Sequence, residues 1–426
     1  MIQQVSYRQG NREASRLHEP LYQSGLVKIW NSLARFKRGE NNIPVSLESL
    51  LVKVNRQARN DAWKTGPQLD ALAVLLGAIN ETGRLHAFGR FYVKTMLAEL
   101  LINRARLHEL WQAVPGILAE QRVEKPIIIL GLPRSGTSFL FNLLAQDPSH
   151  RCLSNWETTV SQVPPERPCA YLRDPRRRKG RYLMWFQNYL APHLQEIHEF
   201  HLDGPEECTP LLMQGFATQA LAGMFNVPSY SNWLNGVAHE DTYRHHKRIL
   251  QTLQWRYPGT RWVLKSPDHL AAIDAIIQVY PDACLVHLHR DPLQSVASWA
   301  SLNAAFRSIT AQSVDSGELG AQVLDRLATD MDSYLRQRRG CGNDRFLDVR
   351  YDDLVRDPIR VVEGLYQRFD LDFSPDARKA MRGFLDQDRA KSRHHRYTPE
   401  DFGLSEEMID SRFGKYMDTF DVPRLR

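Results

Sequence analysis

Cysteine is scarce in this chain and never closely paired. The 426 residues include five cysteines, an odd number, and no C-x-x-C sequence. Disulfide frameworks need cysteines in pairs, and structural zinc sites use short cysteine spacings. The composition therefore favours neither kind of site, and we expect a reducing, cytoplasmic location.

Long apolar runs are absent as well. The longest stretch without Asp, Glu, Lys or Arg covers residues 208–239, and Gln, Asn, Ser, Thr, Gly and Pro are spread through it. A helix that crosses a bilayer needs about 20 mostly apolar residues. We therefore expect a soluble protein without a membrane span, and the polar N-terminal stretch indicates no secretory signal.

Neither sign of charge dominates. Lys and Arg number 55 and Asp and Glu 49, which gives a net charge of +6. This excess is compatible with an anionic ligand, whereas nucleic-acid binders concentrate more charge on one face, so we expect no nucleic-acid partner. With 42% hydrophobic and 24% charged residues, the composition is that of a folded globular protein.

The densest basic cluster is residues 176–179, between Pro175 and Gly180. A charge run of this kind is usually a solvated surface loop. That is the favoured interpretation, and recognition of an acidic acceptor or partner is the alternative. The cluster belongs to a stretch, residues 162–257, that is irregular in pattern and contains many aromatic residues and prolines.

Residues 1–123 predict a helical extension. Apolar residues at spacings of three and four form a stripe around Leu97 and Leu107, and residues 69–79 show a second helical pattern. No run of β-branched residues occurs before Pro126, and no catalytic motif is evident.

From residue 124 onward, short apolar runs alternate with helical patterns. The runs are at 127–130, 262–264, 284–288 and, more weakly, 345–349. Helical patterns lie at 138–144, 270–279, 293–302 and 361–369. This alternation predicts a P-loop-like, three-layer α/β fold with a central parallel sheet flanked by helices. We assign residues 124–426 to this domain, with an acceptor-binding insertion at about 160–257.

A Gly- and Ser-containing loop follows the first predicted strand and opens a helix. Its residues are Arg134, Ser135, Gly136, Thr137 and Ser138. Such a turn directs backbone N–H groups and the positive end of a helix at one point, which suits a phosphate. The hydroxyl groups add donors, and Arg134 adds a planar cation for oxyanions.

The same loop almost matches the ATP-binding motif G-x-x-x-x-G-K-[ST], but Thr137 stands where that motif has lysine. The strand at 284–288 also continues into His289, Arg290 and Asp291 rather than into an obvious magnesium-holding aspartate. A P-loop ATP-dependent kinase or phosphotransferase is therefore the alternative function. A non-catalytic nucleotide-binding protein is a third hypothesis.

A second anion site is predicted after the strand at 284–288. Arg290 stands at the end of this strand, and Ser298 follows eight residues later, about two helical turns on. Ligands of open α/β sheets bind at the carboxyl ends of the strands. The two strand ends are thus expected to hold two distinct phosphates.

The two motifs together resemble a known family. P-R-S-G-T-S at 133–138 and R-D-P-x-x-x-x-x-S at 290–298 are similar to motifs of sulfotransferases that use 3′-phosphoadenosine 5′-phosphosulfate (PAPS). The likeness is to the branch with bacterial sulfotransferases and, more distantly, to tyrosylprotein sulfotransferases. It extends from about residue 124 to the C-terminus and includes residues 264–267, 351–354 and 401–404. It implies transfer of a sulfuryl group from PAPS to the hydroxyl of a small-molecule alcohol or phenol.

This resemblance also implies roles for particular residues. The loop from Arg134 to Ser138 would hold the 5′-phosphosulfate, and Arg290 with Ser298 would hold the 3′-phosphate. Lys265 fits the lysine that the family places near the end of a middle strand, and with Arg134 it would stabilise the leaving phosphate. Lys391 and Arg393 match the family only loosely, as residues that close over the nucleotide.

For the general base, Glu157 is the first candidate. A glutamate in a comparable place serves as base in the tyrosylprotein relatives, and a structural ion pair is the alternative role. His269, His198 and His201 are the other candidates for the base. His198 and His201 are three residues apart, but no third ligand at a suitable spacing is evident, so no metal is expected.

The uncharged stretch 208–239 is the candidate acceptor pocket. It contains Phe216, Phe225, Tyr230 and Trp233, which suit an apolar alcohol or phenol. A buried core helix of the same composition is an equal alternative. The identity of the acceptor is left open by the sequence, and a homo-oligomer is compatible with it.

Overall fold

A five-stranded sheet lies at the centre of the computed structural model, which describes residues 24–36, 44–192, 194, 200–388 and 398–424. Its strands, in spatial order, are β2 (His150–Arg151), β5 (Arg261–Lys265), β1 (Ile127–Gly131), β6 (Cys284–His289) and β7 (Phe346–Arg350). All neighbouring pairs are parallel. The four strands expected from the apolar runs are therefore confirmed as β1, β5, β6 and β7. His198, Lys391 and Arg393 lie outside the described residues.

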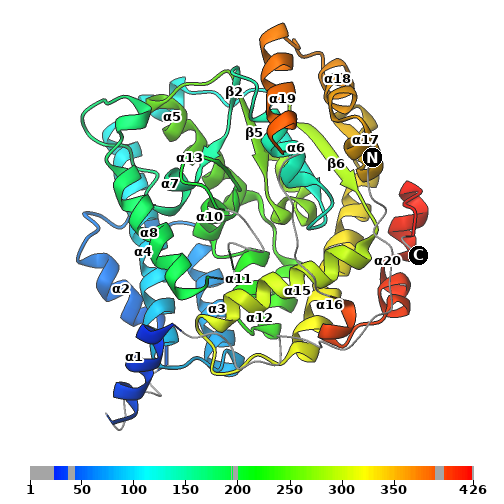
Figure 1. The fold of residues 1–426 in the computed structure, drawn as a ribbon. Helices are drawn as coiled ribbons and strands as arrows, with labels where there is room; N and C mark the ends of the chain where they lie inside the picture. Colours follow the sequence, from blue (N-terminus) through cyan, green and yellow to red (C-terminus); the bar gives the residue numbers. More distant parts are fainter. Residues whose placement is uncertain (1–23, 37–43, 193, 195–199, 389–397, 425–426) are drawn as a thin grey trace.

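Each face of the sheet is covered by its own set of helices (Figure 1). Ile127 and Ile129 of β1 pack on one side and Ile128 and Leu130 on the other, because side chains of a strand alternate between faces. The first face is covered by α6 (Thr137–Leu144), α17 (Tyr351–Arg356), α18 (Pro358–Arg368) and α19 (Pro375–Asp388). The second is covered by α13 (Glu240–Arg256), α14 (Ile273–Val279), α15 (Pro292–Ser308), α16 (Ser316–Arg339) and α20 (Glu406–Phe420). The predicted three-layer fold is confirmed.

The described part of the N-terminal region is helical. Its elements are α1 (Gly25–Phe36), α2 (Leu47–Asn55), η3 (Ala62–Lys64), α3 (Gln68–Thr82), α4 (Ala87–Ala113) and α5 (Gly116–Glu120). Leu97 and Leu101 of α4 are fully buried, and they share one hydrophobic cluster with Phe216, Phe225 and Tyr230. The leucine stripe of the sequence therefore packs against residues of the predicted insertion.

The region 160–257 is largely helical, although its pattern predicts irregular structure. It contains η4 (Tyr171–Arg173), α8 (Arg176–Leu190), α10 (Thr209–Leu212), η5 (Met213–Gly215), α11 (Gln219–Met224), α12 (Pro228–Trp233), η6 (Leu234–Gly236) and α13. Helices α10, α11 and α12 have only four to six residues, too few for a period to show. The longer α13 buries His245, His246, Gln251 and Thr252, and these polar residues conceal its inner face in the sequence. No helix that the structure describes is long and apolar enough to cross a membrane.

The basic cluster at 176–179 is also not a loop. It forms the first turn of α8, and Pro175 precedes this turn as the N-cap residue. Arg176 is buried, and its guanidinium forms an ion pair with Asp174 at 2.7 Å. In the sequence Pro175 and Gly180 indicate a loop. Proline is, however, also favoured at a helix start, and Gly180 lies within α8.

Candidate active site

The loop between β1 and α6 has the backbone shape of an anion cradle. Arg134 and Gly136 have φ angles of 64° and 94°, and Gly131 has a φ of 146°. A β carbon on Gly131 would lie 2.7 Å from Ser135 Oγ and 2.9 Å from the carbonyl oxygen of Leu288, so only glycine fits there. Gly136 caps α6 without a side chain, which leaves the first N–H groups of the helix for a ligand.

The three hydroxyl residues of the loop have different surroundings. Ser135 is buried, and its Oγ donates a hydrogen bond of 2.7 Å to the carbonyl of Leu132, so it fixes the turn. Thr137 is also nearly buried. Ser138 is exposed, and its Oγ accepts a hydrogen bond of 3.1 Å from Lys265 Nζ. The structure thus brings Lys265 to the first turn of α6.

Lys265 is the last residue of β5 and lies beside Ile129 of β1. Its side chain is only 6% exposed, and its ammonium forms an ion pair with Glu207 Oε1. Glu207 follows β4 (Pro205–Glu206), which pairs antiparallel with β3 (Leu153–Ser154). A lysine and a glutamate therefore meet at the N-terminus of the phosphate-loop helix.

The second carboxylate oxygen of Glu207, Oε2, also accepts a hydrogen bond. Thr209 Oγ1 donates to Glu207 Oε2 at 3.2 Å, and it lies 2.9 Å from Ser266 Oγ. Ser266 Oγ in turn donates to Asp268 Oδ2 at 3.2 Å. This series of hydrogen bonds fixes the direction of the carboxylate. The sequence does not indicate a role for Glu207. This residue lies near the end of β5 only because β3 and β4 pair over two residues, and so short a pairing leaves no pattern in the sequence.

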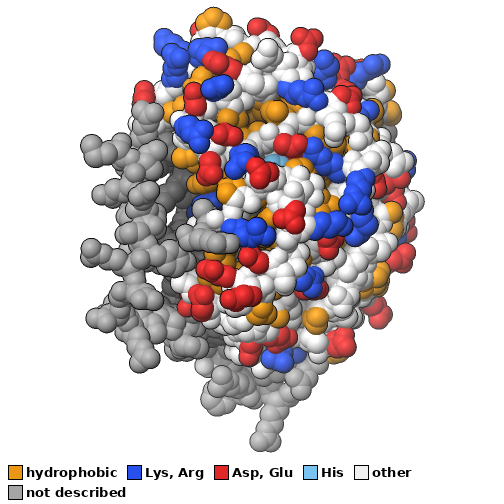
Figure 2. Space-filling model, turned by 90° about the vertical axis from the view of Figure 1, so that its right-hand side faces the viewer, with side chains coloured by type: hydrophobic (Ala, Val, Ile, Leu, Met, Phe, Trp, Pro, Cys, Tyr) orange, Lys and Arg blue, Asp and Glu red, His pale blue; other side chains and the backbone are white. Residues whose placement is uncertain are grey.

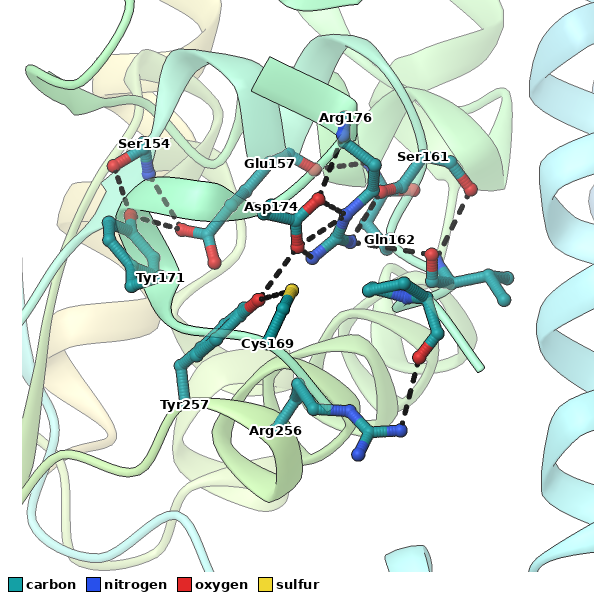
Figure 3. A network of polar contacts seen from close by, with 12 residues as sticks. Ser154, Glu157, Ser161, Gln162, Cys169, Tyr171, Asp174, Arg176, Arg256 and Tyr257 are labelled. Carbon is teal, nitrogen blue, oxygen red and sulfur yellow. Dashed lines mark hydrogen bonds and ion pairs between the residues drawn. The ribbon is translucent and has the colours of Figure 1, made fainter. Parts of the chain in front are cut away.

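Glu157, the first candidate for the base, is held in an ion pair away from solvent. Its carboxylate is fully buried and forms two hydrogen bonds with Arg151, 3.0 Å from Nη1 to Oε2 and 2.5 Å from Nη2 to Oε1. The backbone N–H of Ser154 and the hydroxyl of Tyr171 also donate to Oε2, at 3.1 and 3.2 Å (Figure 3). Glu157 closes a capping box at the start of α7 (Asn155–Thr159). These contacts form the structural ion pair that the sequence leaves open as the alternative role of Glu157.

The histidine candidates differ in exposure. His269 belongs to η7 (Pro267–Ala271) and is fully buried, with Nδ1 2.6 Å from the hydroxyl of Tyr243. Burial holds the pKa of His269 well below its usual value, and a ring without solvent contact cannot meet an acceptor. His201 is exposed on the turn before β4, and its role remains a prediction.

Arg290 lies against the phosphate loop. It follows β6, and its Nη1 donates a hydrogen bond of 2.7 Å to the carbonyl oxygen of Arg134. The guanidinium carbon lies 3.8 Å from the ring centroid of Tyr351, a cation–π contact that fixes its plane. Ser298 lies on α15 and is 3% exposed. The two predicted anion sites are therefore neighbours through Arg290, and the role of Ser298 remains a prediction.

The aromatic residues expected to line an acceptor pocket are mostly core. Phe216, Phe225 and Tyr230 are at most 1% exposed and pack against the N-terminal helices. The core alternative therefore holds for them. A cavity of about 120 Å³ in this region has polar walls instead, which include Asp268 and Asp330. Burial raises the pKa of Asp268 to about 6 and that of Asp330 to about 7.

One group of residues in the described part has the spacing of metal ligands. His287 and His289 of β6 face Asp348 of β7, with their ligand atoms within 4.8 Å of one another. Arg338 already donates to both oxygens of Asp348, at 2.6 and 2.5 Å. A guanidinium thus neutralises this carboxylate, and we interpret the group as an ion-pair network under α16 and α20.

Comparisons with known proteins agree with this geometry. A sequence profile described as the sulfotransferase family matches residues 126–375. The omega-hydroxy-beta-dihydromenaquinone-9 sulfotransferase Stf3 of Mycobacterium tuberculosis is 25% identical over 318 residues, which are 71% of this chain and 76% of Stf3. Sulfotransferase STF1 from Mycobacterium tuberculosis has 28% identity and a TM-score of 0.77, covering 87% of this chain and 99% of its own. Sulfotransferase STF9 from Mycobacterium avium has 28% identity and a TM-score of 0.76, covering 90% and 98%.

Proposed function

We propose that this chain, which belongs to the sulfotransferase family, transfers a sulfuryl group from PAPS to the hydroxyl group of a lipid-like small molecule. The observation that carries the proposal is the meeting of Lys265, Ser138 and Glu207 at the first turn of α6. A cation, a helix N-terminus and a carboxylate base are the three groups that such a transfer needs in one place.

The donor fits the two adjacent anion sites. The uncapped N–H groups of α6 and the exposed Arg134 and Ser138 suit the 5′-phosphosulfate. Arg290, fixed on the face of Tyr351 beside the loop, suits the 3′-phosphate that PAPS has and ATP lacks. Ser298, Lys391 and Arg393 complete the proposed nucleotide site.

The proposed chemistry is an in-line displacement. Glu207 takes the proton of the acceptor hydroxyl while the oxygen of that hydroxyl forms the new bond to sulfur. The bond from sulfur to the 5′-phosphate oxygen breaks at the same time, and Lys265 and Arg134 stabilise the negative charge that develops on this oxygen. Thr209 holds Glu207 in place for the proton transfer.

The acceptor class follows from a relative and remains part of the proposal. Stf3 acts, according to its name, on an omega-hydroxy menaquinone. A long-chain apolar alcohol is therefore the proposed acceptor for this chain. His201, exposed before β4, is the proposed residue of the acceptor entrance.

The donor is tested by calorimetry with adenosine 3′,5′-bisphosphate and with ATP–Mg²⁺. We expect tight binding of the bisphosphate without a metal. A preference for ATP, with a requirement for Mg²⁺, would replace the proposal with the kinase alternative. The reaction itself is tested by following labelled sulfur from PAPS into a panel of long-chain and short-chain alcohols.

A further inference from the structure

Exposed apolar side chains gather on two neighbouring helices. Among the described residues, twelve large hydrophobic side chains are exposed. Seven of them belong to α1 or α8, and an eighth, Phe91 of α4, lies beside α1. We call these eight the apolar patch: Leu26, Ile29, Trp30, Leu33, Phe91, Tyr182, Trp185 and Tyr189. Ile29 and Leu33 are each 64% exposed, and Trp185 is 59% exposed. A concentration of this kind marks an interaction surface, whereas single exposed apolar residues do not.

The two helices lie side by side. The backbone N–H of Leu26 donates to the hydroxyl of Tyr189 at 3.3 Å. On their inner faces, Val27 of α1 and Leu190 of α8 belong to one buried cluster with Phe88. Each helix therefore has a buried apolar face and a second apolar face that is exposed.

The exposed faces are regular. Tyr182, Trp185 and Tyr189 follow the spacing of one helix face. The rings of Tyr182 and Trp185 are tilted with centroids 5.9 Å apart, and those of Trp185 and Tyr189 are stacked at 6.0 Å. The ring centroid of Trp30 on α1 lies 4.9 Å from that of Phe91 on α4. The exposed aromatic side chains therefore form two groups of packed rings, one on α8 and one between α1 and Phe91, rather than isolated rings.

The charged side chains of the two helices have one sign, although Arg177 of α8 pairs with the exposed Asp203. Neither α1 nor α8 contains Asp or Glu. Lys28, Arg178, Lys179 and Arg181 are exposed on these two helices. The side of the molecule that carries the C-terminal helices is different, since acidic and basic side chains alternate on it and apolar groups are small (Figure 2).

Trp, Tyr and basic residues around an apolar helix face are the composition of segments that lie in a membrane interface. Exposed Lys and Arg add attraction to anionic lipid headgroups. We propose that the apolar patch docks this protein onto the surface of a membrane that contains anionic phospholipids.

The patch is connected to the proposed active site. Helix α8 packs on α7 (Figure 1), where a β carbon on Gly180 would lie 2.7 Å from Trp156 Cβ. Asn155 of α7 donates to Glu206 at 2.7 Å, and Glu206 directly precedes Glu207. Docking through α8 therefore brings α7 and the chain segment that leads to Glu207 near the bilayer, where lipid-like alcohols are dissolved. This consequence rests on the proposed function, whereas the docking does not.

Vesicle co-sedimentation of the full chain tests the docking. The probes are vesicles of phosphatidylcholine alone and of phosphatidylcholine with an equal part of phosphatidylglycerol. We expect binding to the anionic vesicles that weakens at high salt. The triple variant Ile29→Ser, Leu33→Ser, Trp185→Ser should lower the bound fraction at least about tenfold, because each group loses its apolar contact with lipid. The charge variant Arg178→Glu, Arg181→Glu should lower binding only to the anionic vesicles.

The matched control is Val355→Ser with Met408→Ser, two exposed apolar residues outside the patch; it should bind as the unchanged chain does. Equal binding of the triple variant, or no binding of the unchanged chain, would overturn the proposal. Self-association that the triple variant abolishes, without vesicle binding, would show that the surface contacts a second copy instead.

Sulfate transfer to a short-chain, water-soluble alcohol separates the two proposals. The triple variant should retain this transfer, and its melting temperature should match that of the control. If the unchanged chain transfers sulfuryl groups to neither the short-chain nor the long-chain alcohols, the proposed function is contradicted and the docking result stays intact.

Discussion

At the scale of single residues, the fully buried Glu157 and the partly exposed Glu207 differ in what they contact. Glu157 binds Arg151 of β2, the backbone N–H of Ser154 and Tyr171 of η4, none of which lies on the phosphate loop. Glu207 binds Lys265, which also contacts the phosphate-loop helix. The position of a glutamate in the chain does not distinguish these cases, because both follow short strands of two residues.

We predict that Glu207→Gln lowers kcat by about 10²–10⁴-fold with little change in affinity for adenosine 3′,5′-bisphosphate. The amide keeps the shape of the side chain but cannot accept the proton. Steady-state kinetics and calorimetry on the same preparation measure the two quantities. Unchanged turnover would move the base to another residue, with His201 tested next.

Glu157→Gln should act on stability instead. It leaves the buried Arg151 without its charged partner, which costs about 3–5 kcal/mol in the free energy of unfolding. Urea unfolding measures this loss, and adding Arg151→Met should recover part of it because no unpaired charge remains. A variant of normal stability with reduced turnover would restore the catalytic role expected from the sequence.

Arg290→Ala should weaken binding of adenosine 3′,5′-bisphosphate by about 1.5–3 kcal/mol, the value of a charged hydrogen bond. Arg356→Ala, an exposed arginine on α17 with 76% side-chain exposure, is the matched control and should leave the affinity unchanged. Calorimetry compares the two variants. Adenosine 5′-monophosphate, which lacks the 3′-phosphate, should bind the Arg290 variant and the unchanged chain equally well.

At the scale of elements, the sequence predicts those strands and turns whose residue types are required by their local surroundings. The strands β1, β5 and β6 are continuous apolar runs because both faces of a parallel sheet are covered. The phosphate loop is visible because Gly131 and Gly136 adopt positive φ angles that few other residues allow. The helices of the insertion are not visible in the sequence, since the short ones have no period and α13 buries histidines on its inner face.

Gly131→Ala should therefore abolish tight nucleotide binding, because its β carbon meets Ser135 Oγ and a backbone carbonyl at a strained φ. Gly77→Ala is the matched control in the middle of α3, where a β carbon has no atom within 4 Å. It should raise the free energy of unfolding by about 0.5–1 kcal/mol. Unfolding curves and calorimetry on both variants check the contrast.

At the scale of the whole molecule, buried neutral histidines make stability depend on pH. Burial lowers the pKa of the fully buried His246 from 6.5 to about 3. Burial also lowers, to about 4 each, the pKa values of His86, His108 and His239. Below pH 6.5 the unfolded chain binds protons that the folded chain does not, so stability is highest above that pH and falls as the solution becomes more acidic.

For His246 alone, the free energy of unfolding should fall by about 2 kcal/mol between pH 6.5 and about pH 5. His246→Gln should remove that share of the pH dependence, although it weakens the contact with the hydroxyl of Tyr280 at every pH. Urea unfolding at a series of pH values measures the slope, and His201→Gln, at an exposed position, is the control. An identical slope in the His246 variant and the unchanged chain would contradict this account.

The short ladder of β3 with β4 has a consequence for how acceptor preference changes. Leu153 pairs with Glu206 and Ser154 with Pro205, so the ladder ties together both ends of the intervening fifty residues. Insertions or exchanges within 155–204 can alter α7 and α8 without displacing Glu207 from Lys265. Chimeras that take this segment from a relative should keep Glu207 beside Lys265 and retain the parent's donor, and a changed acceptor range in them would show that the segment contributes to acceptor choice.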